Sequence, residues 1–320
     1  MISRHTVLVF LKGLAMGAAD SVPGVSGGTI AFITNIYDEL LDAIAAVNPG
    51  TLRILRQHGI AAAWQRIHGP FLLPLLCGIV LALVSSANVM VYLLEQHYTY
   101  LMCTFTGLIL ASVVLVGSHF SRWQKRDMVL VLGGAGVSVI LALLPQFRGT
   151  DSLLYIFMCG ALAICAMILP GISGAFILLL LGAYGPVLAA LINLDLPVVG
   201  VFVLGCITGL LSFARLLSWL LHSRRQPTLA VLLGILAGSV YSLWPWRALT
   251  PCDLADAACQ GTDHAFRYYR NEAVQAIDVV SGEPVSLMWC AVLVAAGALL
   301  VLGIEQIAGR FGKLSNSSGV

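Results

Sequence analysis

Six apolar runs in this sequence are long enough to cross a lipid bilayer, and they constrain the fold more than any other feature. A helix needs about 20 apolar residues to span roughly 30 Å of hydrocarbon. Only 10% of the 320 residues are charged, against about 25% in a typical soluble domain. The sequence therefore predicts an all-α polytopic membrane protein. The expected spans lie near residues 71–94, 100–118, 128–145, 197–221, 228–246 and 285–305.

Two further pairs of apolar segments are each interrupted by a short tip that contains Pro-Gly. The pairs are 6–20 with 25–46 and 152–168 with 172–193. The first tip reads DSVPGVSGGT, from Asp20 to Thr29. Backbone outside a helix is costly in hydrocarbon, so a tip at membrane depth must be buried in protein or face a polar cavity. We therefore expect both tips to meet near the middle of the membrane.

The tip motif occurs twice in the chain. Pro-Gly-x-Ser-Gly starts at Pro23 and again at Pro170, and we call this displacement along the sequence (170 − 23) the tip offset. Tyr37 matches Tyr184 at the same offset. A short pattern of this kind is weak evidence when it occurs once, and its duplication makes it a stronger sign of an internal repeat.

A second block of sequence also repeats. The segment around Gly107 resembles the segment around Gly234, and we call this displacement (234 − 107) the span offset. It is shorter than the tip offset, which we attribute to an extra loop near 50–69 in the first copy. Residues 1–145 and 150–310 are therefore predicted to be two repeats of one transmembrane domain.

Each predicted repeat has a broken, re-entrant helix pair and three transmembrane helices. An odd number of crossings inverts the second repeat relative to the first, as in many secondary transporters.

Basic residues indicate which side of the membrane each loop faces. They gather at four places between the apolar runs: 53–66, 122–126, 224–225 and 310–313. The positive-inside rule places these four segments in the cytoplasm, together with both termini, and the long 247–284 loop outside. The formal net charge of +2 is too small to indicate a nucleic-acid partner. Cys252 and Cys259 in the outward loop are either a disulfide or two free thiols.

The tips carry the features of an anion site. Proline in a first helical turn and serine as a cap are good helix starters, and the start of a helix attracts phosphate. Glycines let a ligand or another backbone approach closely. The candidate phosphate contacts at the tips are Ser21, Gly24, Ser26, Gly27, Gly28, Thr29, Gly171, Ser173 and Gly174. The alternative is that the tips only join the two repeats through small residues.

Several charged side chains fall within or next to the apolar segments. Arg215 lies inside the 197–221 run, and its counterpart at the span offset is Asn88. Ionisable residues within a membrane are functional candidates, so Arg215 is predicted to pair with a phosphate, the alternative being that it reaches the cytoplasmic surface. Asp38, Glu39 and Asp42 are interpreted as a solvated interfacial face.

Asp20 is a candidate for coupling transport to protons. It stands beside the first tip and has no acidic counterpart in the second repeat, where Met167 occupies the equivalent position. Low dielectric and a neighbouring phosphate both disfavour the charged carboxylate, so Asp20 is predicted to carry a proton. The alternative is that it only caps the following turn.

An enzymatic interpretation of the Ser-Gly motif has less support. Gly-x-Ser-Gly resembles the nucleophile motif of intramembrane serine proteases, which needs a general base next to the serine. All seven histidines lie in loops or at the ends of spans. We therefore expect no catalytic residue, and the sequence suggests no cofactor or metal.

The stretch GLAMGAADSVPGVSGGT, together with the second PGISG, resembles a bacterial polytopic membrane family long known only as a domain of unknown function and now associated with undecaprenyl-phosphate translocation. The resemblance covers nearly the whole chain. The residues that match the family's motifs are Asp20, Ser21, Pro23, Gly24, Ser26, Gly27, Gly28, Thr29, Pro170, Gly171, Ser173 and Gly174. The second copy departs at Ala175 and Phe176.

The resemblance implies a flippase. Its lipid substrate, undecaprenyl phosphate, would return from the outer to the inner leaflet of the bacterial cytoplasmic membrane for synthesis of cell-envelope polymers. A transporter or channel for a small anion is the alternative, because the same tips would serve it without an opening toward lipid. The sequence does not indicate an oligomeric state.

Overall fold

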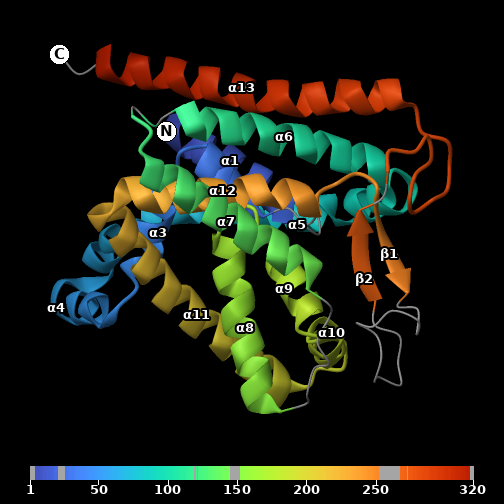
Figure 1. The fold of residues 1–320 in the computed structure, drawn as a ribbon. Helices are drawn as coiled ribbons and strands as arrows, with labels where there is room; N and C mark the ends of the chain where they lie inside the picture. The colour runs from blue at the N-terminus through green and yellow to red at the C-terminus, as the bar shows by residue number, and fades with distance from the viewer. Residues whose placement is uncertain are drawn as a thin grey trace.

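The computed structural model describes residues 4–20, 26–118, 120, 122–144, 152–251, 267–271 and 273–317. Within these residues the chain forms thirteen helices and one two-stranded sheet (Figure 1). The helices are α1 (Arg4–Asp20), α2 (Gly27–Ile33), α3 (Tyr37–Ala45), α4 (Pro49–Arg66), α5 (Gly69–Gln96), α6 (Tyr98–Ser118), α7 (Lys125–Leu143), α8 (Leu153–Ile168), α9 (Gly174–Leu180), α10 (Tyr184–Ile192), α11 (Leu196–Ser223), α12 (Arg225–Ser242) and α13 (Leu287–Ser317).

The two strands belong to the loop that was expected to face outward. β1 (Arg247–Pro251) pairs antiparallel with β2 (Arg267–Asn271), Arg247 lying opposite Asn271. The all-helical prediction therefore holds for the apolar part of the chain, and the hairpin is a local addition. The predicted Cys252–Cys259 pair lies outside the described residues.

Helix boundaries in the two halves correspond residue by residue. Both ends of α2 and of α3 reappear at the tip offset as the ends of α9 and α10, so that Gly27 corresponds to Gly174. Both ends of α5 reappear at the span offset as the ends of α11, so that Gly69 corresponds to Leu196. The difference between the two offsets is supplied by α4, so the extra loop expected near 50–69 is a helix.

The helices also pack in corresponding pairs. α1 packs against α5 as α8 packs against α11, while α7 packs against α12 as α13 packs against α6. Glycines permit these contacts at equivalent positions: a Cβ on Gly78 would stand 2.3 Å from the Phe10 carbonyl oxygen, and one on Gly205 would stand 2.1 Å from that of Phe157. In lipid, where apolar surface gains little from association, such close backbone contact holds helices together.

The segments that follow the tips are broken, although the sequence was interpreted as continuous there. Asn35 separates α2 from α3 with φ 56°, and Gly182 separates α9 from α10 with φ 65°. Asn and Gly tolerate this left-handed conformation better than other residues. α9 and α10 are bent by 110° relative to each other. Each tip is therefore followed by a short helix of two turns and a residue in the left-handed conformation, Asn35 or Gly182, and we call these two breaks the elbows.

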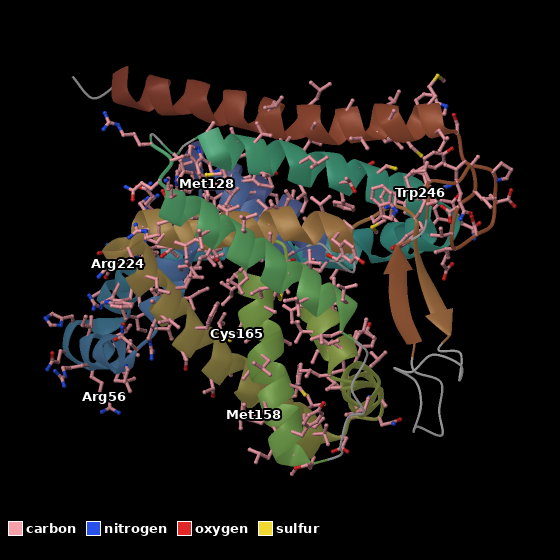
Figure 2. The ribbon with its side chains drawn as sticks, viewed as in Figure 1. Arg56, Met128, Met158, Cys165, Arg224 and Trp246 are labelled. Carbon is pink, nitrogen blue, oxygen red and sulfur yellow. The ribbon has the colours of Figure 1, made fainter. Side chains whose placement is uncertain are left out.

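By length and composition, three helices in the described part of the chain can cross a membrane: α6, α7 and α11. The number rises to five if each of two bent pairs, α4 with α5 and α9 with α10, counts as one span. In Figure 1, α8 and α11 project away from the layer formed by α6, α7, α12 and α13. Figure 2 shows Arg56 and Arg224 at one end of the molecule and Trp246 at the other.

Candidate functional site

The two tips meet, and three hydrogen bonds join the two halves at and beside them. The Ser26 hydroxyl donates to the carbonyl of Met167 (2.7 Å), and the Tyr37 hydroxyl donates to the carbonyl of Ile168 (3.1 Å). In the opposite direction the Gly171 N–H donates to the Thr29 hydroxyl (2.9 Å). We call this contact the tip junction. It connects the starts of α2 and α3 to the end of α8, and α2 to the turn before α9.

Ser26 organises the first tip. It is the N-cap of α2, and its hydroxyl oxygen accepts the Gly28 N–H (3.1 Å) while donating to Met167. This is the capping role that serine performs at helix starts. A Cβ on Gly28 would lie 2.5 Å from the Ile168 carbonyl oxygen. The closeness of the tips therefore requires glycine at position 28, and the Ser26 hydroxyl is fully used inside the protein.

The second tip contains the same motif with fewer internal contacts. Ser173 precedes α9 but does not cap it; the residue is buried as a whole, and its hydroxyl makes no hydrogen bond within the described part of the chain. Gly171 has φ 89°, and a Cβ there would approach the Leu236 Cα to 2.9 Å. Gly174 lies against the Ala163 carbonyl. Ser173 is therefore a polar group at the junction that the described residues leave without a partner.

Asp20 closes the first tip at its other end. Its carboxylate accepts the Gly27 N–H at 2.6 Å, so it binds the first residue of α2. Ser21 and Gly24 fall within 21–25, outside the described residues. The predicted proton transfer by Asp20 stays a prediction.

Both short helices after the tips have a capped C-terminal end. The Lys12 ammonium donates to the Thr34 carbonyl (2.8 Å), and the Tyr155 hydroxyl donates to the carbonyl of Leu181, the counterpart of Thr34 at the tip offset. A cation stabilises the negative end of a helix dipole, and a hydroxyl satisfies the same carbonyl without charge. Equivalent carbonyls are thus satisfied by different chemistry in the two halves.

Arg215 does not reach the tip junction through any contact in the described residues. Its guanidinium donates to the Val47 carbonyl (2.6 Å), just beyond the end of α3, and its side chain is exposed. Asn88, its counterpart, lies in α5, and its side chain is outside the described set. The predicted phosphate contact of both residues stays a prediction.

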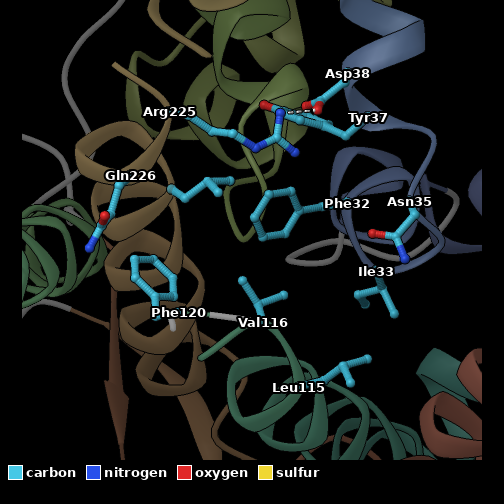
Figure 3. Close-up of a pocket in the computed structure, with 11 residues that line it drawn as sticks. Phe32, Ile33, Asn35, Tyr37, Asp38, Leu115, Val116, Phe120, Arg225 and Gln226 are labelled. Atoms are coloured by element: carbon cyan, nitrogen blue, oxygen red, sulfur yellow. Dashed lines mark hydrogen bonds and ion pairs between the residues drawn. The ribbon is translucent and has the colours of Figure 1, made fainter. Parts of the chain in front are cut away.

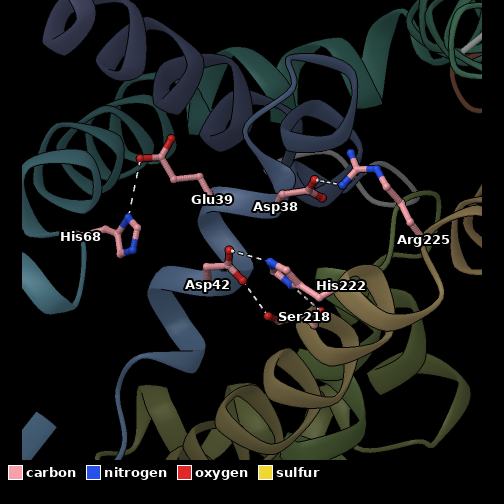
Figure 4. A network of polar contacts seen from close by, with 7 residues as sticks. All are labelled: Asp38, Glu39, Asp42, His68, Ser218, His222 and Arg225. Atoms are coloured by element: carbon pink, nitrogen blue, oxygen red, sulfur yellow. Dashed lines mark hydrogen bonds and ion pairs between the residues drawn. The ribbon is translucent and has the colours of Figure 1, made fainter.

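The acidic face of α3 contacts basic residues on other helices (Figure 4). Asp38 pairs with Arg225 at 2.7 Å, and Asp42 accepts a hydrogen bond from the Ser218 hydroxyl at 2.6 Å. His222 lies 3.7 Å from Asp42, and His68 lies 3.9 Å from Glu39. The sequence led us to interpret these acids as a solvated interfacial face, but Asp42 also contacts α11 and Asp38 contacts α12. Both helices are distant from α3 in sequence, so these contacts could not be predicted.

A cavity of about 470 Å³ lies beside the Asp38–Arg225 pair (Figure 3). Its polar lining includes Asn35, Tyr37 and Gln226 in addition to that pair. The remaining lining is apolar and consists of Phe32, Ile33, Leu115, Val116, Phe120 and Leu229. Sequence reasoning missed this cavity. The sequence feature that could have indicated it is Arg225, which stands directly before an apolar run and which we used only to assign membrane topology.

Comparisons with known proteins agree with the family resemblance. Residues 16–258 match the model of the VCA0040-like family, described as undecaprenyl phosphate translocase-like. A polyprenyl-phosphate transporter of Vibrio cholerae serotype O1 is 39% identical over 299 residues, covering 93% of this chain and 96% of the relative. One of Staphylococcus aureus is 29% identical over 256 residues, covering 73% and 85%. No solved structure matches the chain.

The matched region includes both tips, the elbows that follow them and α12, so it contains every part of the tip junction. The resemblance suggested by the tip motifs is confirmed. The relatives are named transporters, which agrees with a protein that is not an enzyme. The chain therefore belongs to the VCA0040-like family of undecaprenyl phosphate translocase-like membrane proteins.

Proposed function

We propose that this protein moves undecaprenyl phosphate across the bacterial cytoplasmic membrane, from the outer to the inner leaflet, as a flippase built from two inverted repeats. The observation that carries the proposal is the tip junction, where a buried serine without a partner in the described residues, Ser173, lies at the contact between the two halves. The names of the two relatives support a polyprenyl phosphate as the substrate.

A phosphate headgroup needs hydrogen-bond donors in the middle of the membrane. Next to the start of α9 the Ser173 hydroxyl is such a donor, because it makes no cap hydrogen bond to that helix and has no other partner in the described residues. In the first tip the corresponding groups bind protein atoms, so opening the junction would release the Ser26 hydroxyl and the Gly171 N–H for the headgroup. Transport then consists of exchanging bonds between the tips for bonds to phosphate, with the prenyl chain remaining in lipid.

The same site would serve a small inorganic anion, which is the second candidate function. The two candidate functions need different paths through the protein. A lipid phosphate needs a lateral opening between helices for its prenyl chain, whereas a free anion needs a continuous polar path. The Ser173 donor does not distinguish them, so the transport assay includes both substrates.

The test is transport by purified full-length protein in proteoliposomes. Undecaprenyl phosphate in the two leaflets is measured by enzymatic accessibility from outside, and labelled inorganic phosphate uptake is measured in parallel. Ser173→Ala is expected to slow lipid translocation roughly tenfold, the equivalent of a charge-assisted hydrogen bond of about 1.5 kcal/mol. Ser212→Ala, which removes an exposed hydroxyl bonded only to the Thr208 carbonyl of its own helix, is the control. Normal lipid transport by Ser173→Ala would remove the serine from the site, and uptake of inorganic phosphate alone would favour the second function.

Asp20 is proposed to couple this movement to protons. The proton would be loaded on the outside together with phosphate and released in the cytoplasm. Asp20→Asn retains an oxygen that can accept the Gly27 N–H but cannot release a proton. We expect this variant to bind phosphate and to lose stimulation by a pH gradient. A gradient response equal to that of the wild type would leave Asp20 as a cap only.

A further inference from the structure

We propose that the cavity between α2, α3, α6 and α12 is a second binding site for a phosphate monoester attached to an apolar chain, with Arg225 as its cation. The inference rests on the proposed function and adds a location for the headgroup away from the tip junction. Arg225 projects from the start of α12 to one side of the cavity, and Leu115 lies on the opposite side (Figure 3). The walls thus combine one guanidinium with a mainly apolar surface.

The ion pair that holds Arg225 is weak enough for a phosphate to displace. The side chains of Arg225 and Asp38 are 63% and 42% exposed, although their charged atoms lie 2.7 Å apart. Exposed pairs contribute little to stability, because water screens them. A guanidinium binds phosphate through two parallel hydrogen bonds, and a phosphate carries more charge than one carboxylate. Asp38 therefore acts as a competitor that a phosphate can replace.

The opposite end of the molecule provides an independent observation. α6 is the counterpart of α12, and the first residues of the two helices, Tyr98 and Arg225, are related by the span offset. At the start of α6 the Thr99 N–H donates to the carboxylate of Asp278, at 2.8 Å. A protein carboxylate thus occupies this helix start, where the helix dipole favours an anion. At the equivalent start of α12 the N-cap residue, Arg224, makes no side-chain cap hydrogen bond.

The residues that create the cavity's charge are specific to this end. The counterpart of Arg225 is Tyr98, and the counterpart of Asp38 is Gly185. Gln226 lines the cavity and also contacts the 122–127 segment, donating to the Arg122 carbonyl (3.1 Å) and to Asp127 (2.6 Å). That segment holds three basic residues against one acid, Asp127, so its net positive charge adds to the attraction for an anion. By the positive-inside rule this end is the cytoplasmic one, where a translocated headgroup would be released.

The size and lining of the cavity favour a lipid headgroup over free phosphate. Its volume of about 470 Å³ falls in the range of roughly 300–1,000 Å³ of sites that hold drug-sized ligands. Six of the eleven lining residues are apolar, which suits the first isoprene units of a prenyl chain. Inorganic phosphate would gain the contact to Arg225 and nothing from those walls.

The test measures binding to full-length protein in nanodiscs by calorimetry, with farnesyl phosphate as the probe and inorganic phosphate and farnesol as comparisons. Arg225→Gln is expected to weaken farnesyl phosphate binding by roughly tenfold or more. Asp38→Asn removes the competitor and is expected to tighten it severalfold. Arg224→Gln makes the same charge change one residue away, outside the cavity lining, and should weaken binding far less than Arg225→Gln.

Unchanged binding in Arg225→Gln, or an equal loss in Arg224→Gln, would overturn the proposal. Weaker binding in Asp38→Asn would overturn the competition between carboxylate and phosphate, and this variant keeps the test decisive if Arg225→Gln folds poorly. Inorganic phosphate binding as tightly as farnesyl phosphate would contradict the lipid assignment. If the wild type moves no undecaprenyl phosphate yet shows the expected pattern of these variants, the proposed function fails and the site stands. If the wild type transports undecaprenyl phosphate normally and neither Arg225→Gln nor Asp38→Asn changes farnesyl phosphate binding, the proposed function stands and the second site fails.

Discussion

The two tips share the Pro-Gly-x-Ser-Gly motif but use it differently. In the first tip the Ser26 hydroxyl makes two hydrogen bonds, one to its own helix and one to the second half. In the second tip Ser173 makes neither, although both serines precede a helix of seven residues. A duplicated motif therefore supplies a structural contact in one copy and an available hydroxyl in the other.

This difference follows from the residues around the serines. Gly28 lets α2 approach the end of α8, whereas Ala175 occupies the equivalent position in the second copy. Thr29 supplies the acceptor for Gly171, whereas its counterpart is Phe176. The polar contacts of the junction come mainly from the first copy. The second copy contributes backbone carbonyls and one N–H, and the Ser173 hydroxyl has no partner in the described residues.

The strongest test of this asymmetry is Gly28→Ala, which gives the first tip the residue of the second. The new Cβ would lie 2.5 Å from the Ile168 carbonyl oxygen and 2.8 Å from that of Met167. Neither backbone atom can move freely, so we expect a loss of about 3 kcal/mol in stability, at the upper end of overpacking costs. Thermal unfolding of the purified protein measures it. Gly185→Ala, whose Cβ meets no atom within 4 Å, is the control, and equal melting temperatures for both variants would contradict the close packing of the tips.

Thr29→Val tests the bond that runs in the other direction. Valine retains the shape and removes the acceptor of the Gly171 N–H, which is buried in the junction. A buried donor without a partner costs roughly 1–3 kcal/mol. The matched control is Thr208→Val, because the Thr208 hydroxyl is exposed and bonds only to a carbonyl of its own helix. A melting temperature that falls no further in Thr29→Val than in the control would show that the junction does not depend on this bond.

Ser26→Ala and Ser173→Ala form a matched pair that divides stability from transport. Removal of the Ser26 hydroxyl leaves the Gly28 N–H and the Met167 carbonyl unpaired, and loss of a helix cap typically costs about 1 kcal/mol. Ser173→Ala removes a hydroxyl that has no partner in the described structure, so its melting temperature should stay at the wild-type value while lipid transport slows. Similar melting temperatures for the two variants would mean that both serines have the same role.

The duplicated tip motif and a contact between the tips could be anticipated from the sequence, because both depend on patterns that a chain displays directly. The inverted arrangement of the repeats and the position of the tips in the membrane stay predictions. The motif at Pro23 and Pro170 and the tyrosines that follow established the tip offset. The elbows were missed, since Asn35 is an ordinary polar residue unless it is compared with Gly182, its counterpart. Such a pair indicates a left-handed turn, because these are the two residues that adopt it most readily.

The partners of the polar groups could not be predicted. Ser26 donates to the backbone of Met167, and a carbonyl carries no signature in the sequence. Arg225 and Asp38 are far apart in the chain, and their pairing depends on how α12 packs near the elbow. Residue type therefore identified which groups are polar at the tips, while the three-dimensional packing decided which of them are already satisfied.

The smallest expected effect concerns the two helix starts that were compared above, at α6 and α12. The Asp278 carboxylate accepts N–H groups from Thr99, Val280 and Ser281. Burial alone raises the pKa of this carboxyl, and the hydrogen bonds outweigh it, so the pKa of Asp278 lies below its ordinary value of 3.8. A carboxyl with a lowered pKa in the folded protein contributes stability that is present above the unfolded value and is lost as pH falls through the folded value.

Acid should therefore weaken the attachment of the outward loop to α6 only below about pH 4, the ordinary range of an aspartate. The prediction is that Asp278→Asn lowers the melting temperature at pH 7 and that the difference from the wild type narrows once the pH falls below that value. The control is Asp195→Asn, an exposed cap at the start of α11 with a single contact, to the Val198 N–H at 3.3 Å. The melting temperature of Asp195→Asn should stay close to that of the wild type from neutral pH to pH 3. A gap for Asp278→Asn that is constant from neutral pH to pH 3 would show that the α6 start does not depend on the anion.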